Sequence, residues 1–259
     1  MTIPSRDKIA RLTGRPQARC LWVDIPSAMV AEIAGRAGAE AVVLDTEHGQ
    51  IGPETLADML RALEVSHTPG IVRLGDAGAG RVKHALDAGA AGVLIPFVET
   101  ADQAREAVRA FYTPPFGTRG LAPAVSRAAA YGADADYAKT WNQRGILALQ
   151  IETAKGLANA AEIAAVEGVD MLFFGPGDFS LDCGLSLTSD GAAIMEACRK
   201  VIAAAHGADK MAGAFPWADG GSPAQLLAEG ADLVAAGSDV RAMAGGLAAG
   251  LAACPLPQP

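Results

Sequence analysis

The segment AGAEAVVLDTEHG (residues 37–49) contains the unit from which most of this chain is built. A Gly-containing turn ends one helical segment, an apolar run follows, and polar residues begin where that run stops. Similar turns, AGAA (residues 88–91) and EGAD (residues 229–232), precede two other apolar runs. A short apolar run between segments of helical period is typical of a strand in a parallel sheet that is covered on both faces.

Eight apolar runs of this kind alternate with Ala-rich segments of helical period. The runs are Cys20–Asp24, Ala41–Asp45, Gly70–Leu74, Gly92–Pro96, Ile146–Glu152, Asp170–Gly175, Met211–Phe215 and Asp232–Gly237. Helices are expected at Ser27–Ala37, from Pro53 onward, and at Thr100–Ala110, Gly156–Val166 and Gly191–Ala205. Eight strand–helix units predict the α/β class and a single domain over residues 1–259, folded as a TIM-type (β/α)8 barrel.

The connection between Tyr112 and Gly145 departs from the regular unit, because it is long and rich in Pro and Gly. Loops of this length in compact domains are usually functional or cover an active site, and we expect the same here. Arg119 and Arg127 lie in this connection. They can bind a carboxylate or phosphate of a substrate, although an ordinary surface position explains them equally well.

Composition excludes several classes of protein. The net charge of −8 disfavours nucleic-acid binding, since contacts to phosphate dominate that affinity. The N-terminal segment lacks the apolar core of a signal peptide, and no apolar run is long enough to span a bilayer. The four cysteines show neither paired nor zinc-ligand spacing. We therefore expect a soluble cytoplasmic protein without nucleic-acid or membrane partners.

Charged residues stand where several of the predicted strands end, and in a barrel those ends meet at one mouth. They are Asp45, Glu47 and His48 after the second run, Arg73 in the third, Gln150 and Glu152 in the fifth, and Asp178 after the sixth. Side chains alternate along a strand, so Gln150 and Glu152 share one face. A buried carboxylate needs a partner, and Asp178 is placed to share a cation with Glu152. An ion pair with Arg or Lys is the alternative for either acid alone.

The motifs around these residues resemble the HpcH/HpaI aldolases, a family of class II pyruvate aldolases that act on 4-hydroxy-2-oxoheptanedioate, 2-dehydro-3-deoxyglucarate or hydroxypyruvate aldols. The matching motifs are LDTEHG (residues 44–49), VR (72–73), GVLIPFVETADQAREAVRA (92–110), YTPPFGTRG (112–120), QIET (150–153) and GVDMLFFGPGDFSLDCG (168–184). The resemblance runs from about Leu12 to about Ala249. It implies an aldolase that uses Mg²⁺, Mn²⁺ or Co²⁺ to join or separate pyruvate or hydroxypyruvate and an aldehyde through an enolate.

The same resemblance implies roles for particular residues. Glu152 and Asp178 would be metal ligands. Arg73 would contact the keto oxygen, and Gln150, with the backbone N–H groups of Gly177 and Asp178, would bind the oxo acid near its metal and carboxylate.

Further roles concern proton transfer, the aldehyde and assembly. His48 would transfer the proton, with Asp45 beside it, and Asp87 matches a position that reaches a histidine of a neighbouring subunit. Phe215 stands where relatives have a smaller aliphatic residue, so it would reshape the aldehyde pocket. The resemblance also implies a homo-oligomer, often a hexamer built as a trimer of dimers, and the Ala/Gly-rich segment Arg241–Ala253 could pack on a neighbouring subunit.

Two other functions stay open at this point. One is a different enolate-forming lyase, such as one that cleaves a CoA thioester, and the other is an oxo-acid sensor that does not catalyse. A Schiff-base mechanism is disfavoured, because no lysine stands at the end of a predicted strand. Residues 75–80 (GDAGAG) depart from the segment usual in relatives, and His67, His84 and His206 lie in predicted loops or helices away from strand ends.

Overall fold

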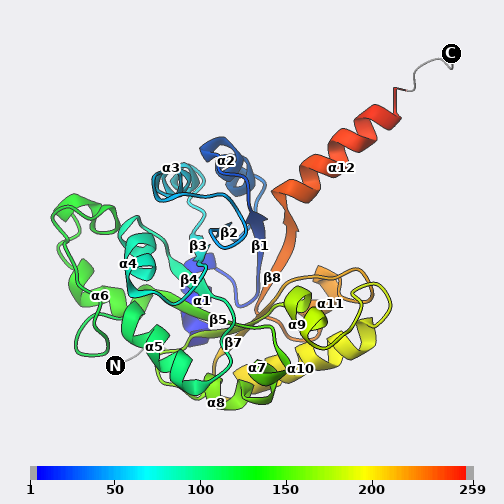
Figure 1. The fold of residues 1–259 in the computed structure, drawn as a ribbon. Coiled ribbons are helices and arrows are strands. Elements are labelled where there is room, and N and C mark those ends of the chain that lie inside the picture. The colour runs from blue at the N-terminus through cyan, green and yellow to red at the C-terminus, as the bar shows by residue number, and fades with distance from the viewer. Residues whose placement is uncertain (1–4, 255–259) are drawn as a thin grey trace.

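The computed structural model describes residues 5–254, which form a closed barrel of eight parallel strands in chain order (Figure 1). The strands are β1 (Ala18–Val23), β2 (Ala41–Asp45), β3 (Gly70–Arg73), β4 (Gly92–Ile95), β5 (Ile146–Ile151), β6 (Met171–Phe174), β7 (Met211–Ala214) and β8 (Leu233–Ser238). Each of the eight predicted strands is present, and its ends lie within about two residues of the expected ones. The predicted (β/α)8 barrel is therefore confirmed.

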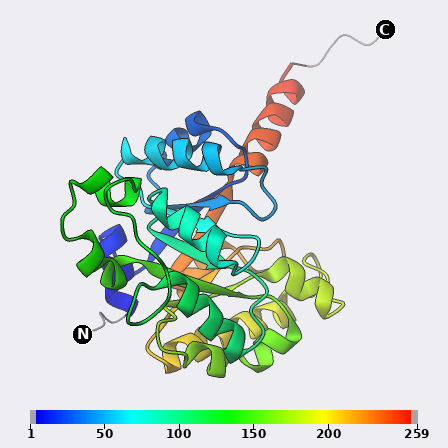
Figure 2. The ribbon, with the colours of Figure 1, turned by 60° about the vertical axis from the view of Figure 1, so that its left-hand side comes forward.

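Helices surround the barrel and connect its strands (Figures 1 and 2). They are α1 (Ser5–Thr13), α2 (Ala28–Arg36), α3 (Pro53–Glu64), α4 (Ala79–Asp87), α5 (Ala101–Phe111), α6 (Tyr137–Arg144), α7 (Ala154–Ala158), α8 (Ala160–Ala164), α9 (Pro176–Asp182), α10 (Gly191–Gly207), α11 (Pro223–Ala228) and α12 (Asp239–Ala252), with a 3₁₀ helix at Arg127–Gly132. The helix expected at Gly156–Val166 is instead the pair α7 and α8, which meet at Asn159.

The repeated turns before strands have one conformation in common. Gly38, Gly89 and Gly230 have φ angles of +89°, +101° and +102°, in the left-handed region that a side chain disfavours. Each of these residues follows a helix and precedes a strand, so it reverses the chain at the amino end of the barrel. The recurring Gly in the sequence therefore marks a recurring piece of backbone geometry.

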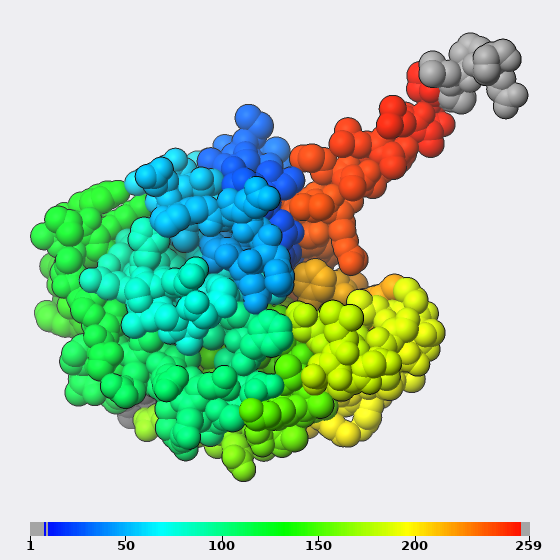
Figure 3. Space-filling view, in the orientation of Figure 1, coloured from blue at the N-terminus to red at the C-terminus, as the bar shows by residue number. Residues whose placement is uncertain are grey.

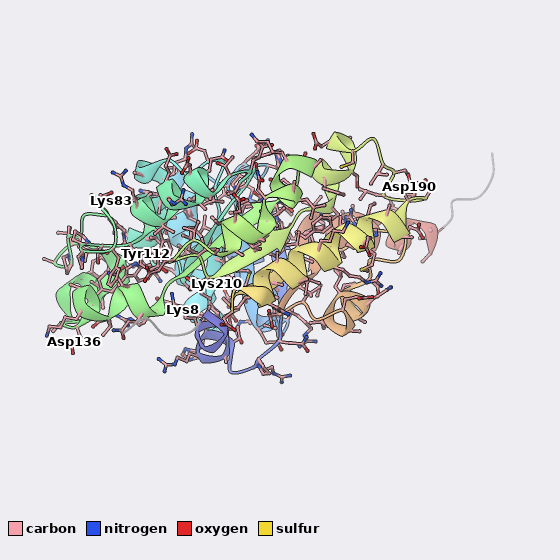
Figure 4. All side chains as sticks on the ribbon, turned by 90° about the horizontal axis from the view of Figure 1, so that it is seen from below. Lys8, Lys83, Tyr112, Asp136, Asp190 and Lys210 are labelled. Atoms are coloured by element: carbon pink, nitrogen blue, oxygen red, sulfur yellow. The ribbon has the colours of Figure 1, made fainter. Side chains whose placement is uncertain are left out.

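Helix α1 closes the amino end of the barrel. The Nζ atom of Lys8 donates hydrogen bonds to Asp170 and to the carbonyl of Gly145, both at 3.0 Å, and to the Tyr112 hydroxyl at 3.3 Å. Figure 4 shows Lys8 and Tyr112 on the same side of the molecule. The Lys8 and Asp170 side chains are each only 4% exposed, so their charges depend on this pairing.

The long connection between α5 and β5 also lies at the amino end. Because it follows a helix and leads into a strand, it lies next to residues such as Ala90 and Ala91, which precede β4. The mouth of this barrel is at the opposite end, so the expectation that the connection covers a site in that mouth is wrong. Loops after strands, not loops after helices, surround that mouth.

Helix α12 leaves the barrel instead of packing along it, and it stands away from the remaining surface in Figures 1 and 3. None of its 14 residues is buried. Within residues 5–254, no helix combines the length and the apolar character needed to cross a membrane.

The Lys8–Asp170 pair leads to a prediction about stability. Replacing Asp170 with Ala leaves the Lys8 ammonium buried without its carboxylate, and we expect a loss of about 3–5 kcal/mol in the free energy of unfolding. Urea denaturation followed by circular dichroism measures this loss. The control is Asp58→Ala, which removes an exposed ion pair with Arg61 and should cost no more than about 1 kcal/mol. Equal losses in both variants would contradict the role given to the buried pair.

Candidate active site

A cavity of about 430 Å³ opens at the carboxyl ends of the strands. It is lined by Trp22, Asp24, Asp45, His48, Arg73, Gln150, Glu152, Phe173, Gly175, Pro176, Gly177, Asp178, Phe215, Ser238, Val240 and Arg241. These residues come from the ends of seven strands or from the first residues after them. The position is the one at which barrels of this type carry their chemistry.

The alternation of side chains along each strand explains why these residues reach the cavity. On β5, Ile146 and Ala148 belong to the apolar cluster inside the barrel, and Gln150 and then Glu152 continue the same face toward the mouth. On β3, Arg73 continues the inner face begun by Ile71. The interior is thus apolar at its floor and polar at its mouth, as the sequence predicted for Gln150 and Glu152.

Arg73 is clamped between two carboxylates. Its Nε atom donates to Oδ1 of Asp45 at 3.1 Å, its Nη2 atom donates to Oδ2 of the same carboxylate, and its Nη1 atom lies 2.9 Å from Oε2 of Glu47. The guanidinium also lies over the ring of Trp22, 5.0 Å from its centre. The Arg73 side chain is only 10% exposed, so a fixed positive charge is held at the cavity wall.

Asp45 is the fixed anion of the site. Burial raises its pKa, but hydrogen bonds from Arg73 and from Nε1 of Trp22 (3.2 Å) outweigh burial and hold the pKa at about 2. The Asp45 carboxylate also accepts the backbone N–H groups of Glu47 at 2.9 Å and His48 at 3.3 Å. These bonds turn the chain sharply after β2 and place the His48 side chain, 64% exposed, at the rim of the cavity.

Glu152 is the buried carboxylate that the sequence predicted. Its Oε1 atom accepts the backbone N–H of Phe97 at 2.8 Å, and its Oε2 atom accepts the side-chain amide of Gln150. Burial, together with the charges of Glu47 and Asp178, raises the pKa of Glu152 to about 7. The Oε1 atom of Gln150 is also buried, and it has no hydrogen-bond partner among the described residues.

This arrangement fits a divalent cation. Glu152 and Asp178 are close enough to raise the pKa of Glu152, and a cation between them would remove that repulsion and favour both carboxylates. In residues 5–254, no three His, Cys, Asp or Glu side chains converge into a metal site made of protein alone. Mg²⁺ is commonly bound by one or two carboxylates, with water and substrate oxygens in the other positions.

An aromatic wall closes the other side of the cavity. The ring of Trp22 packs edge-on against Phe215, with 5.2 Å between centres, and tilted against Phe173 at 5.8 Å. Phe215 follows β7 directly and lines the cavity, as expected. The space between this wall and the carboxylates is apolar on one side and charged on the other, which suits a small oxygen-rich ligand with a carbon chain.

Eight of the nine site residues expected from the sequence line this cavity: His48, Arg73, Asp45, Gln150, Gly177, Asp178, Phe215 and Glu152. Asp87 does not, because it lies at the end of α4, where its carboxylate pairs with Arg119 at 2.7 Å. Arg119 and Arg127 are also away from the cavity; Arg127 donates to the carbonyl of Ala88.

Several residues that line the cavity were not predictable from the sequence motifs alone. Trp22 and Asp24 lie at the end of β1, and Ser238 and Arg241 lie where β8 passes into α12. Asp24 had a usable signal, since it ends an apolar run in the same way as Asp45 does. Trp22 had none, because a tryptophan inside an apolar run is normally a core residue.

Comparison with known proteins gives consistent matches. A model of the family described as HpcH/HpaI aldolase/citrate lyase matches residues 19–245. The hydroxypyruvate/pyruvate aldolase of Agrobacterium fabrum is 38% identical over 245 residues, which cover 95% of this chain and 91% of that protein. An HpcH/HpaI aldolase/citrate lyase family protein from Burkholderia cenocepacia has a similar structure, with a TM-score of 0.85 at 32% identity over 96% of this chain and 98% of that one. The citrate synthase SbnG has a TM-score of 0.82 at 27% identity, over 96% of this chain and 97% of that one.

The packing around Gly175 leads to a prediction about cation binding. A Cβ atom at this position would lie 2.6 Å from both Nε2 of Gln150 and Oε2 of Glu152, which are buried and cannot move freely. The added methyl group would displace Glu152 and the Gln150 amide that orients it. We therefore expect Gly175→Ala to weaken Mn²⁺ binding at least about tenfold, which is the usual effect of disturbing the groups that orient metal ligands. Titration calorimetry measures the binding. Gly80→Ala, where a Cβ atom meets nothing within 4 Å, is the control, and unchanged Mn²⁺ affinity in Gly175→Ala would contradict the prediction.

Proposed function

The chain belongs to the HpcH/HpaI aldolase/citrate lyase family and is a carbon–carbon lyase of the aldolase type, and from this premise we propose that it is a divalent-metal-dependent class II aldolase. The reaction is the reversible aldol addition or cleavage between a pyruvate-type 2-oxo acid and an aldehyde. One observation carries the proposal: a clamped guanidinium, Arg73, faces the same small cavity as the carboxylates of Glu152 and Asp178. We also propose pyruvate and hydroxypyruvate as donors, since the relative from Agrobacterium fabrum is named a hydroxypyruvate/pyruvate aldolase.

Glu152 and Asp178 would hold the metal, which we propose to be Mg²⁺, Mn²⁺ or Co²⁺. A bound divalent cation supplies Lewis-acid polarisation of the ketone next to the carbon that loses its proton. The Gln150 amide holds the Glu152 carboxylate in place, and its buried Oε1 atom adds an oxygen to the ligand side of the cavity.

Arg73 stabilises the oxygen that becomes negative when the 2-oxo acid forms its enolate. Its charge is permanent, and its position is fixed by Asp45 and Glu47, so little reorganisation is needed as charge develops. The N–H groups of Gly177 and Asp178, in the first turn of α9, have no acceptor within their helix and bind the donor carboxylate. Donor binding thus uses groups from β3, β5 and α9.

His48 carries the proton between solvent and the reacting aldol, with Asp45 holding the turn on which it stands. Phe215 and Trp22 form the apolar side of the pocket for the aldehyde carbon chain.

We favour an aldolase over a CoA-thioester lyase, because Arg73 and Arg241 are the only Lys or Arg residues among those described that line the cavity. Arg73 is already paired, which leaves little basic surface for a nucleotide.

We propose further that the protein works as a cytoplasmic homo-oligomer, a hexamer in the simplest case, in which α12 packs on a neighbouring subunit. One stripe of α12 exposes large apolar side chains: Val240 by 46%, Met243 by 49%, Leu247 by 65% and Leu251 by 78%. Such a stripe on an isolated helix marks an interaction surface. In that assembly, we propose that Asp87 approaches the His48 side chain of a neighbouring subunit.

Metal dependence is tested by chelation. Exhaustive EDTA treatment should abolish release of pyruvate from 4-hydroxy-2-oxo acids, and added Mg²⁺, Mn²⁺ or Co²⁺ should restore it, since enolate formation needs the Lewis acid. A coupled lactate dehydrogenase assay follows the pyruvate. Glu152→Gln should not regain activity with any of the three metals. Full cleavage activity after chelation would contradict the proposal.

The guanidinium is tested by substitution. Arg73→Ala and Arg73→Lys should each lower kcat for aldol cleavage by about 10²–10³-fold, because the planar donor at the developing oxyanion is lost. The lysine variant keeps a positive charge between Asp45 and Glu47, so it separates catalysis from folding. The control is Arg105→Ala on the exposed side of α5, which should match the unaltered protein. An active Arg73→Lys enzyme would remove Arg73 from the reaction.

The role of α12 is tested by a charge on its apolar stripe. Leu247→Arg should shift the protein to smaller species in sedimentation velocity, because a desolvated guanidinium opposes burial of that stripe. Ala249→Arg, with the same charge on the opposite side of the helix, is the matched control. Identical sedimentation of Leu247→Arg and the unaltered protein would argue against packing of α12 on a second copy.

A further inference from the structure

Asp24 occupies a defined position at the mouth of the barrel, on the strand opposite the metal-side carboxylates. It follows Val23, the last residue of β1, and continues the inner face formed by Cys20 and Trp22, so it lines the cavity. The backbone is fixed here as well. The Asp239 carboxylate accepts the N–H of Asp24 at 3.1 Å and that of the next residue, Ile25, at 2.9 Å.

The Asp24 and Asp45 carboxyl groups are neighbours at the mouth, because Val23 of β1 pairs with Leu44 of β2 and the two aspartates are the next residues on those chains. Two neighbouring carboxylates repel each other, which raises the pKa of Asp24 and favours a proton on the pair. The Asp45 oxygens already accept from Arg73, Trp22 and two backbone N–H groups, which favour its anion. Of the two carboxyl groups, Asp24 is therefore the one that favours the proton, and Asp45 the one that favours the charge.

The charged groups around Asp24 come from three elements. Asp45 on β2 and Asp239 on α12 disfavour its anion, and Arg73 on β3 favours it. Burial is the largest influence, and together with the two neighbouring carboxylates it raises the pKa of Asp24 to about 7. His48 and Arg241 border the same cavity. A carboxyl group in these surroundings gives up and takes back a proton near neutral pH, as efficient acid–base catalysis requires.

We propose that Asp24 is a second acid–base group of the aldol reaction, placed to exchange a proton with the oxygen of the acceptor aldehyde. The inference rests on the proposed aldolase function. In cleavage, the Asp24 carboxylate takes the proton of the 4-hydroxyl group, the electrons of that O–H bond form the aldehyde C=O bond, and the carbon–carbon bond breaks to leave the enolate. In the direction of aldol addition, the enolate carbon forms a bond with the aldehyde carbon, and protonated Asp24 gives its proton to the alkoxide oxygen.

The geometry favours Asp24 for this step over the other cavity carboxylates. Asp45 is held as an anion by Arg73, and Glu152 is assigned to the metal. His48 is largely exposed at the rim, with its ring 3.9 Å from Glu47, so it is placed to pass protons between solvent and the site, and Asp24 to meet the aldehyde oxygen inside it. Asp24 combines a position in the cavity lining, a fixed backbone and a neighbouring carboxylate, and it lies beside the aromatic wall formed by Trp22 and Phe215.

The test is Asp24→Asn, which keeps the size and polarity of the side chain but cannot exchange the proton. Asp102→Asn, on an exposed carboxylate of α5, is the matched control. Two reactions of the metal-loaded enzyme are compared between pH 5 and 9: cleavage of a 4-hydroxy-2-oxo acid, and decarboxylation of oxaloacetate. Both give the pyruvate enolate, but only cleavage removes a hydroxyl proton.

We expect Asp24→Asn to lower kcat for cleavage by about 10²-fold and to leave decarboxylation within a few-fold of the control. The rise of cleavage kcat as pH passes about 7, where Asp24 becomes the base, should also disappear in this variant. Unchanged cleavage with an unchanged pH profile would overturn the inference. An equal loss of both reactions would also overturn it, because Asp24 would then act on the shape of the site and not on the proton.

A measurement without substrate separates this inference from the proposed function. Infrared spectra of the metal-loaded protein should contain a protonated-carboxyl band at slightly acid pH that is absent in Asp24→Asn and retained in Asp102→Asn. If the Asp24→Asn variant keeps this band, the protonated carboxyl group is not Asp24, and the inference is overturned. If the unaltered protein decarboxylates oxaloacetate but cleaves no 4-hydroxy-2-oxo acid, the aldolase proposal fails, and the band still decides whether Asp24 carries the proton.

Discussion

The contact between the Arg73 guanidinium and the Asp45 carboxylate is the interaction on which the barrel mouth depends. Asp45 is completely buried, and without Arg73 its charge would face the desolvation cost of the interior. The pair also fixes its surroundings, since Asp45 orients the turn after β2 and Arg73 lies over Trp22. A permanent positive charge is thereby kept among several acids, at the point where we propose that the enolate oxygen forms.

The fold was predictable because each strand–helix unit repeats the same local signals. Apolar runs gave the strands, and Gly residues such as Gly38 and Gly89 marked the turns before them. The alternation of side chains along a strand correctly predicted that Gln150 and Glu152 share one face, because residues two positions apart lie on the same side of any strand. The function class came from motifs at strand ends and from resemblance, and it needed no contact that only coordinates reveal.

Other features were outside the reach of the sequence, or were read wrongly. The length of the connection after α5 suggests a functional loop or a cover for an active site, but any connection that follows a helix in this fold lies at the amino end of the barrel, away from the cavity. The clamping of Arg73 by both Asp45 and Glu47 depends on how two neighbouring strands are aligned. Asp24 was counted as the last residue of a strand, and its meeting with Asp45 follows from the pairing of β1 with β2.

The Asp239 carboxylate joins the start of α12 to the rim of the cavity. This one side chain begins α12 and also holds the backbone of Asp24 and Ile25, so the orientation of the helix and that of the turn after β1 are mechanically linked. Asp24, whose side chain lines the cavity, is thus held in place by the first residue of the helix that stands away from the barrel.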